Sequence, residues 1–302
     1  MKIFICGNCQ LDALTDAVIA ALDIQGIKSE VSGRRYNDKA FADADKSGAL
    51  CRFLNGFDLV VTNTYQLKAY LDRHNSTYCF LPDLFFHGFH PDICYLRFSR
   101  ASTPLFFHKS TAMSLIVFFG WQNDWSIERT ASSFTDGVFD SLGYFDAFTD
   151  SIDALDERFR ALNFLSEQTI FELSKPERGM HEIGHPTLRV SFSLLKEIFF
   201  KLNIELQITY SDVSDAGVTD ALSNEVIWPV YPEIAQRLGF RGSYLTNKAG
   251  LVLPNLKEFI SWQYNALDEA LLEAGGAKDL IVQHISGIPP YRQFKDVAEI
   301  FL

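Results

Sequence analysis

The sequence predicts an α/β fold with a mostly parallel N-terminal sheet connected by crossover helices, followed by a mainly helical C-terminal part. In the first hundred residues, apolar runs of strand length alternate with amphipathic stretches of helical length. After about residue 105, most segments have helical periodicity instead. We therefore expect an α/β subdomain at 1–105 and a mainly helical subdomain at 106–302, packed together to form a cleft.

The strands predicted in the first part are short apolar runs, and the stretches between them have the period of amphipathic helices. The expected strands are KIFIC (2–6), KSEVSG (28–33), DLVVTN (58–63), TYCFL (77–81) and ICYLRF (93–98). The expected helices between them are 10–22, 44–57 and 66–74, and the later ones are 110–121, 145–163, 187–203 and 255–274. The segment 224–240, with two prolines and two large aromatic residues, predicts an ordered loop before a short helix.

Composition and charge exclude several classes of protein. The chain of 302 residues has a formal net charge of −11, which argues against nucleic acid and anionic membranes as partners. No apolar run reaches the roughly 18 residues that span a bilayer, and the apolar run at the N-terminus is too short for a signal peptide. Five cysteines, an odd number, are typical of free thiols in a reducing compartment. We expect a cytoplasmic protein.

The stretch Gly7-Asn8-Cys9-Gln10 follows the first predicted strand and begins the first predicted helix. Ligands of parallel sheets bind at such strand-to-helix loops. Gly7 allows a sharp turn, and Cys9 falls in the first helical turn, where unpaired N–H groups and the helix dipole stabilise a thiolate. The amides of Asn8 and Gln10 are candidate donors to an oxyanion. The pattern indicates a nucleophilic cysteine.

Two other interpretations of this stretch stay open. Cys9 is also compatible with a small buried thiol at a helix start. Cys6 and Cys9 have the spacing of a CxxC redox or metal pair, although no second CxxC or spaced His pair completes a zinc site. We expect no metal.

Histidines concentrate in two further places. In the segment 81–98, Asp83, His87, His90 and Asp92 lie in one predicted loop, where a carboxylate can orient a histidine as a base. The alternative is that these histidines bond buried loop carbonyls. His185 lies at a predicted helix start with Pro186 as the first helical residue, and the helix dipole there favours a neutral imidazole. A histidine that only caps the helix is the alternative.

A few basic residues follow predicted elements of the first part. In an acidic chain they are candidates for binding phosphate groups. They are Arg34, Arg35, Arg97, Arg100 and Lys109, with His108 beside the last. Neither GxGxxG nor GxxxxGK[ST] occurs, so no standard nucleotide motif supports them.

Three motifs in this order resemble the WcbI family of capsular polysaccharide biosynthesis proteins: Gly7-Asn8-Cys9-Gln10, the stretch GFHPD at 88–92, and His185-Pro186. The resemblance extends over most of the chain. It implies a protein that binds coenzyme A in a deep cleft and transfers an acetyl group to a capsule sugar. Gly184 stands where the family often has Asn before the His-Pro pair, which affects how His185 is held.

The resemblance also assigns roles to residues. We expect catalysis by three side chains and binding of donor and acceptor by others. The resemblance places Cys9, His185 and His90 in the cleft as the catalytic residues, with Asn8, Gln10 and Asp92 beside them. From the residues themselves we add Arg34, Arg35 and Lys109 to Asn8 and Gln10 as coenzyme A contacts, and His87 and Arg97 to Asp92 as acceptor contacts. His185 or His90 would deprotonate a sugar hydroxyl that attacks the thioester directly, or Cys9 would first carry the acetyl group.

Other functions fit the same residues. The same order of strand, turn, nucleophile and helix also fits an SGNH-like esterase or deacetylase. Such an enzyme would cleave esters without coenzyme A. A non-catalytic coenzyme A or ligand-binding protein would hold acetyl-coenzyme A intact. A glycosyl- or sulfotransferase would need a nucleotide motif, and none is present.

Overall fold

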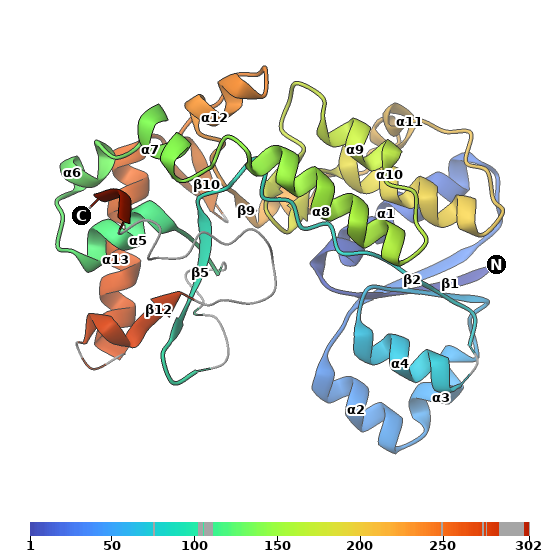
Figure 1. Ribbon diagram of the computed structural model, residues 1–302. Helices are drawn as coiled ribbons and strands as arrows, with labels where there is room; N and C mark the ends of the chain where they lie inside the picture. Colours follow the sequence, from blue (N-terminus) through green and yellow to red (C-terminus); the bar gives the residue numbers. More distant parts are fainter. Residues whose placement is uncertain are drawn as a thin grey trace. The chain divides into compact units, whose positions relative to one another are not determined.

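The computed structural model (Figure 1) describes residues 1–74, 76–101, 105, 111–248, 250–273, 275, 277–283 and 299–301. Backbone contacts divide the chain into two compact units. Unit 1 consists of Met1–Leu84, Asp156–Ser174 and Gly184–Leu222, and unit 2 of Phe85–Leu155, Lys175–Ile183 and Ser223–Leu302. Each unit contains segments from both sides of residue 105, so the division differs from the boundary expected there.

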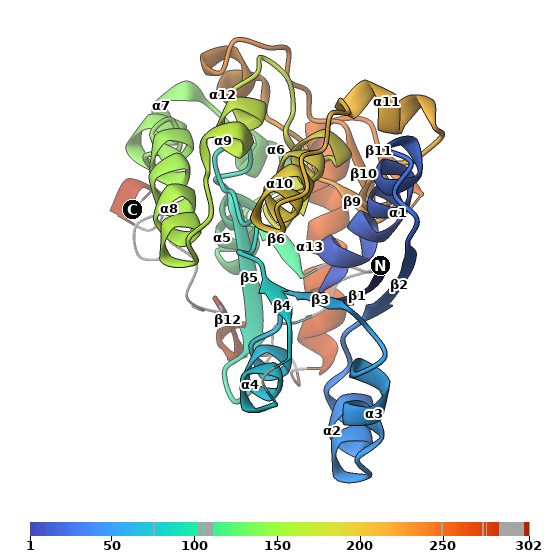
Figure 2. The same ribbon diagram turned by 90° about the vertical axis from the view of Figure 1, so that its right-hand side faces the viewer.

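Unit 1 is built on a four-stranded, entirely parallel sheet (Figure 2). Its strands are β1 (Lys2–Gly7), β2 (Glu30–Arg35), β3 (Leu59–Thr62) and β4 (Tyr78–Phe80), in the order β2-β1-β3-β4. The first four strands predicted from the sequence are confirmed, and so is the α/β fold class. The strand order reverses between β1 and β3, and in open α/β sheets ligands bind outside the carboxyl ends of the strands at such a point.

Helices cover both faces of this sheet because successive side chains of a strand point to opposite faces, and the side chains on both faces are apolar. Ile3 and Ile5 pack with α1 and α10, whereas Phe4 and Cys6 belong to a core formed with α3 and α4. The helices of unit 1 are α1 (Cys9–Ile24), α2 (Asp38–Lys46), α3 (Ala49–Leu54), α4 (Tyr65–Arg73), α9 (Glu167–Leu173), α10 (Leu188–Lys201) and α11 (Tyr210–Asp215). The short strand β8 (His185–Pro186) precedes α10.

Unit 2 has two small antiparallel sheets. One contains β12 (Ile281–Gln283), β5 (Ile93–Phe98) and β6 (Ala112–Ser114), and the other β11 (Leu251–Leu253), β10 (Thr246–Lys248) and β9 (Val226–Ile227). The predicted strand 93–98 is therefore present, but it belongs to an antiparallel sheet. The helix expected from residue 110 begins at Leu115, because Ser114 caps it and residues 112–114 form a strand.

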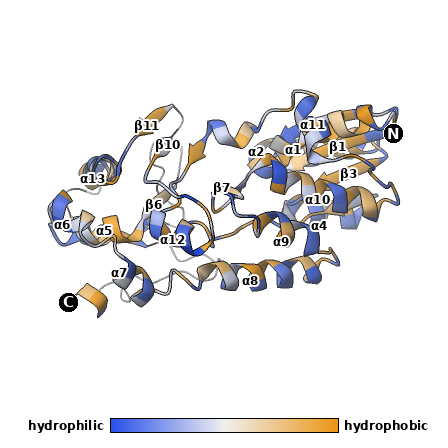
Figure 3. Ribbon diagram, turned by 90° about the horizontal axis from the view of Figure 1, so that it is seen from above, coloured by the Kyte–Doolittle hydropathy of each residue, from blue (hydrophilic) through white to orange (hydrophobic). Residues whose placement is uncertain are grey.

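Helices make up most of the rest of unit 2, in agreement with the predicted periodicity. They are α5 (Leu115–Gln122), α6 (Ile127–Ala131), α7 (Asp136–Ser141), α12 (Pro232–Arg237) and α13 (Leu256–Glu273), with β7 (Met180–Glu182) and the 3-10 turn at Lys278–Leu280. Another 3-10 turn, Ala221–Asn224, and α8 (Ala147–Ala161) are each divided between the units. Figure 3 shows both hydrophilic and hydrophobic residues along α8, as expected of an amphipathic helix. Within the described ranges, no helix has the length and apolar character needed to cross a bilayer.

Candidate active site

Gly7 is the last residue of β1, and space rather than backbone angle requires glycine there. Its φ is not among the positive values of the described glycines, contrary to the sharp-turn role expected from the sequence. A Cβ atom at this position would overlap Oδ1 of Asn63 and the side chain of Leu11. The backbone of β1 therefore approaches the Asn63 amide as closely as it does only because residue 7 has no side chain.

Asn8 is the N-cap of α1. Its side-chain Oδ1 accepts from the N–H of Gln10 at 3.0 Å, and its own N–H donates to Oδ1 of Asn63 at 3.1 Å. Its Nδ2 donates to Oδ1 of Asp83 at 3.2 Å. Asparagine is among the best N-cap residues because its short side chain reaches the first free N–H groups of a helix. These bonds determine that the helix begins at Cys9.

Asn63 and Asp83 complete a polar group at the carboxyl ends of β1, β3 and β4. Nδ2 of Asn63 donates to Oδ1 of Asp83 at 2.8 Å, and the Arg158 guanidinium donates to the Asp83 carbonyl at 3.2 Å. Burial raises the pKa of the Asp83 carboxyl, while the bond from Asn63, the Arg158 charge and the bond from Asn8 lower it. The sequence analysis named Asp83 only as an acidic neighbour of the loop histidines, and it did not assign Asn63 or Arg158 to the site. The rule that selected Asn8, a polar residue directly after a parallel strand, would also have selected Asn63, which follows β3, whereas Asp83 lies three residues beyond the end of β4.

Gln10 is buried and holds two distant loops in place. Its Oε1 accepts from the N–H of Leu84 at 3.1 Å, and its Nε2 donates to the carbonyls of Gly184 at 2.8 Å and Leu84 at 3.3 Å. Gly184 is the residue before His185, so Gln10 ties the start of α1 to the backbone that carries this histidine. These contacts favour a positioning role, and the predicted contact of Gln10 with coenzyme A stays a prediction.

Cys9 and His185 face each other in unit 1. The Cys9 Sγ lies 3.3 Å from Nε2 of His185, and both residues are partly exposed. Cys9 is the first residue of α1, as predicted. His185 lies in β8, and α10 begins only at Leu188 after the cap Thr187, so the prediction of Pro186 as the first helical residue is wrong. A sulfur and an imidazole nitrogen at this separation can exchange a proton, as in cysteine nucleophiles activated by histidine.

The start of α1 also offers a donor to an anion. The N–H groups of Gln10 and Leu11 are used by Asn8 Oδ1 and the Asn8 carbonyl, respectively. The N–H of Cys9 makes no hydrogen bond to the described part of the chain, and it lies at the positive end of the helix dipole. An oxyanion formed beside Cys9 would meet this N–H group.

His90, the second predicted base, is buried in unit 2 and is 2% exposed. Its Nδ1 lies 3.2 Å from the Pro229 carbonyl and its Nε2 3.3 Å from the Met180 carbonyl. Burial, with a smaller contribution from the Arg178 charge, lowers its pKa to about 3, although the two carbonyls oppose this shift. This is the carbonyl-bonding alternative that the sequence left open. The catalytic role of His90 stays a prediction and has no part in the mechanism proposed below.

Asp92 is likewise enclosed in unit 2. Its carboxylate accepts from the hydroxyls of Ser114, of Tyr144 at 2.8 Å and of Tyr231 at 2.7 Å, and from the N–H of Ile116 at 3.1 Å. Burial raises its pKa to about 6, and the four donors oppose that shift. These bonds connect separate elements of unit 2, so the carboxylate stabilises the unit whether or not it also binds an acceptor.

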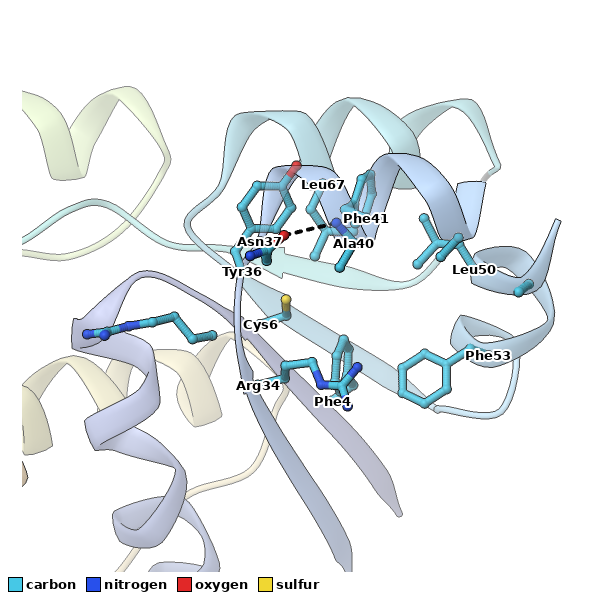
Figure 4. Close-up of a pocket in the computed structure, with 13 residues that line it drawn as sticks. Phe4, Cys6, Arg34, Tyr36, Asn37, Ala40, Phe41, Leu50, Phe53 and Leu67 are labelled. Atoms are coloured by element: carbon cyan, nitrogen blue, oxygen red, sulfur yellow. Dashed lines mark hydrogen bonds between the residues drawn. The ribbon is translucent and has the colours of Figure 1, made fainter. Parts of the chain in front are cut away.

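The remaining predicted contacts lie in different places. His87 is buried in unit 2 at 3% exposure, and the Arg97 guanidinium, in β5, donates to the carbonyls of Phe98 in the same strand and of Ser99 and Ala101 just after it. Lys109 lies outside the described residues. Arg34 and Arg35 line a pocket of unit 1 (Figure 4). In each case the predicted binding role stays a prediction.

The arrangement of the cysteines bears on the interpretation of Cys6 and Cys9 as a redox or metal pair. All five cysteines are free, including Cys6 and Cys9. Cys6 lies within β1 and lines the pocket of Arg34, whereas Cys9 faces His185. Among the residues that the structure describes, no three His, Cys, Asp or Glu side chains gather as a metal site would require.

Comparison with known protein families identifies the chain. The family model described as "Polysaccharide biosynthesis enzyme WcbI" matches residues 2–207, which is more than half of the sequence. Comparisons with curated proteins and with solved structures found no match. The matched region contains the whole of unit 1's parallel sheet, Cys9 and His185. The chain therefore belongs to the WcbI family of polysaccharide biosynthesis enzymes.

Proposed function

We propose that the protein transfers an acetyl group from acetyl-coenzyme A to a sugar hydroxyl, with Cys9 as the nucleophile and His185 as its base. The observation that carries this proposal is the 3.3 Å separation of Cys9 Sγ and His185 Nε2 at the N-terminus of α1. It supports thiol chemistry at the reversal point of the parallel sheet. Membership in a family of polysaccharide biosynthesis enzymes supports a sugar as the acceptor.

In the first half-reaction, the Cys9 thiol gives its proton to Nε2 of His185, and the thiolate attacks the thioester carbonyl. The N–H of Cys9 stabilises the tetrahedral oxyanion. The carbon–sulfur bond to coenzyme A then breaks, and the departing sulfur takes the proton from His185. The products are acetyl-Cys9 and free coenzyme A.

In the second half-reaction, His185 removes the proton of a sugar hydroxyl, whose oxygen attacks acetyl-Cys9. The bond to Cys9 Sγ breaks, and the proton on His185 returns to the thiolate. Gln10 serves both steps by bonding the Gly184 carbonyl beside the base. The close pairing of sulfur and imidazole favours this route over direct attack of the sugar on acetyl-coenzyme A, because His185 faces the thiol itself.

The test is an intact-mass measurement after mixing the protein with acetyl-coenzyme A without acceptor, followed by peptide mapping. We expect a single added acetyl group on Cys9 and release of free coenzyme A. His185→Ala should slow this acylation by about 10²–10⁴-fold, the usual range for loss of a base. Cys51→Ala and His74→Ala are matched controls, because Cys51 is a partly exposed free thiol and His74 an exposed imidazole on other helices.

Three results would redirect the proposal. Full transfer activity in Cys9→Ala would exclude any role of the thiol. Transfer that is abolished in Cys9→Ala without a detectable acetyl adduct in the wild type would favour direct attack. Cleavage of simple esters together with no release of coenzyme A from its acetyl ester would establish an esterase that uses the same pair.

A further inference from the structure

Within the described residues, the outer edge of strand β2 has no partner strand. β2 is the terminal strand in the order β2-β1-β3-β4, so only one of its edges pairs with β1 (Figure 2). On that edge, the N–H of Glu30 donates to the Met1 carbonyl at 2.9 Å, and the N–H of Tyr36 to the Gly7 carbonyl at 2.8 Å. The even-numbered residues of β2 therefore bond β1, and the odd-numbered residues direct their backbone groups away from it.

Val31 and Gly33 carry the backbone groups of this outer edge. Val31 is partly exposed and Gly33 is exposed, and in the part of the chain that the structure describes their N–H and C=O groups make no hydrogen bond. The edge lacks two usual protections against pairing, since β2 contains no proline and its register with β1 runs without a bulge from Glu30 to Arg35. Such an edge is a template for a further strand.

The charges of β2 favour a second copy of the same strand as that partner. Two copies related by a two-fold axis pair antiparallel, and outward-facing residues must then oppose outward-facing residues. With Ser32 on the axis, Val31 opposes Gly33 of the second copy. Glu30 then opposes Arg34 of the second copy. Sliding by one allowed step in either direction separates these charges, and two steps place Arg34 or Glu30 opposite its own copy. Only the first register pairs unlike charges.

Glu30 and Arg34 are accessible to such pairing. Both project from the same face of the strand, because they are an even number of residues apart, and both are exposed. Glu30 has Lys2 as a neighbour at 3.3 Å, but its side chain is 64% exposed, so the carboxylate is open to a second cation. The Arg34 guanidinium makes no hydrogen bond or ion pair to the described residues. Opposite residues of an antiparallel pair have Cβ atoms about 4.5–5.5 Å apart, within reach of an ion pair.

An apolar side chain of α1 lies beside the same edge. A Cβ at Gly33 would lie 2.3 Å from Oγ1 of Thr15, so Thr15 packs directly over β2. Ile19 is one helical turn beyond Thr15 on the same side of α1, and it is 38% exposed. A two-fold axis perpendicular to the sheet keeps the α1 helices of both copies on one side of it. Pairing of the edges would therefore bring the two Ile19 side chains toward each other and remove apolar surface from water.

We propose that β2 pairs with β2 of a second copy of this chain, antiparallel and with Ser32 on the two-fold axis, so that the two parallel sheets continue into one. Each Val31–Gly33 pair exchanges two hydrogen bonds, and the axis repeats every contact. An unrelated peptide would also fit a strand edge, but the order of acid and base along β2 is complemented by an antiparallel copy of β2 itself. The contact includes neither Cys9 nor His185, so the inference is independent of the proposed reaction.

The experiment is sedimentation velocity of the full chain over a concentration series up to about 0.1 mM, which detects dimers of micromolar Kd. Glu30→Arg and Arg34→Glu each reverse one charge, and the double variant exchanges the two charges. Matched controls reverse an exposed charge elsewhere, Glu269→Arg on α13 and Arg52→Glu on α3. Val31→Pro removes an outward N–H that has no hydrogen bond within the described monomer.

We expect a reversible monomer–dimer equilibrium in the parent protein and in both controls. Each single reversal should raise the dimer Kd at least about 10-fold, because it replaces both ion pairs by like charges, and the charge exchange should restore the Kd to within about 3-fold. Val31→Pro should raise it at least about 100-fold, since each copy loses an N–H and presents a ring to the other strand. Ile19→Ser should weaken the dimer about 3- to 10-fold, whereas Ile24→Ser, an exposed apolar position on another side of α1, should not.

Cross-linking tests the register. Ser32→Cys places a thiol opposite its own copy, so mild oxidation should give a disulfide-linked dimer. Lys28→Cys, an exposed control just before β2, should give no more linked dimer than the parent protein does.

Four results would overturn the proposal. They are a monomer at every concentration, a dimer that persists in Val31→Pro, a charge exchange that fails to restore the dimer lost in the single reversals, and no linked dimer of Ser32→Cys. Circular dichroism and thermal unfolding verify that each variant is folded. The charge variants change only exposed side chains, so they test the contact even where Val31→Pro does not fold.

Discussion

The same types of polar side chain differ in solvent exposure between the two units. In unit 1, a histidine faces a cysteine with both groups partly open to solvent, and an aspartate is held by two asparagine amides. In unit 2, His90, Asp92 and Lys248 are each at most 2% exposed. A reacting group must keep access to its substrate, whereas an enclosed polar group acts on the fold by satisfying or straining its neighbours. Accessibility, rather than residue type, separates the candidate site from the structural network.

The largest contrast is expected between the two histidines. His185→Ala should reduce acyl transfer by about 10²–10⁴-fold with little change in stability, because a partly exposed base is lost. His90→Ala should instead lower the free energy of unfolding by about 2–4 kcal/mol, through a cavity and the loss of the hydrogen bond that the neutral imidazole donates to one of the two facing carbonyls. Turnover per folded molecule and urea denaturation measure both effects. Equal losses of turnover in the two variants would abolish the distinction.

Substitutions of one aspartate in each unit compare the units by the loss in free energy of unfolding. Asp92→Asn should cost about 3–5 kcal/mol, because an amide cannot accept from three hydroxyls and an N–H as the enclosed carboxylate does. Asp83→Asn, at the more open edge of unit 1, should cost only about 1 kcal/mol. Chemical denaturation of both variants provides the measurement, and a larger cost for Asp83 would contradict it.

Substitution of Lys248 tests whether an enclosed charge in unit 2 lowers the free energy of unfolding. It is 0% exposed, its Nζ lies 3.7 Å from the centroid of the Trp262 ring, and its Nζ has no hydrogen bond within the described ranges. Burial lowers its pKa to about 7, although the Glu182 charge opposes this shift. Lys248→Met should therefore raise the free energy of unfolding at pH 7 by about 1–4 kcal/mol, as replacement of buried charge by apolar volume does.

The pH dependence of the Lys248 effect has a definite sign. Between about pH 7 and the unfolded value of 10.5, the unfolded chain binds a proton at this amine that the folded chain does not. Stability should therefore rise with pH across this interval in the parent protein. Lys248→Met removes that rise, and urea denaturation at pH 7 and pH 9.5 compares the two proteins. An identical pH slope in both would contradict the shifted pKa.

A smaller effect than that of Asp92→Asn is expected at the close contact of Gly7 in unit 1. Gly7→Ala should cost about 1–3 kcal/mol and slow acylation of Cys9, because the new Cβ overlaps Oδ1 of Asn63. Asn63→Ala removes that oxygen, so the double variant should lose less than the sum of the two single losses. Additive losses in this cycle would show that the contact with Asn63 is not the reason for glycine.

The loop after β1 shows which features of the fold and of the candidate site could be predicted from the sequence. Four strands of the parallel sheet, the helix that starts at Cys9 and the placement of Cys9 at its tip follow from local apolar periodicity and the abrupt polar turn. Asn63 follows the same rule but was not assigned, because the predicted strand 58–63 includes it, and Asp83 was named only as a neighbour of the loop histidines. Gln10 was expected to face a ligand and instead bonds two backbone segments, one of them 174 residues away.

By itself, then, the sequence determined the α/β class, the parallel sheet and the position of a thiol at a helix start, because these depend on neighbours within one or two turns of chain. Only the tertiary structure decided which imidazole meets that thiol. His87, His90 and His185 each stand beside turn-forming residues in the sequence, yet only His185, 176 residues from Cys9, lies within 3.3 Å of its sulfur. Local patterns encode burial and chain direction, whereas pairing across such a separation depends on how the whole of unit 1 packs.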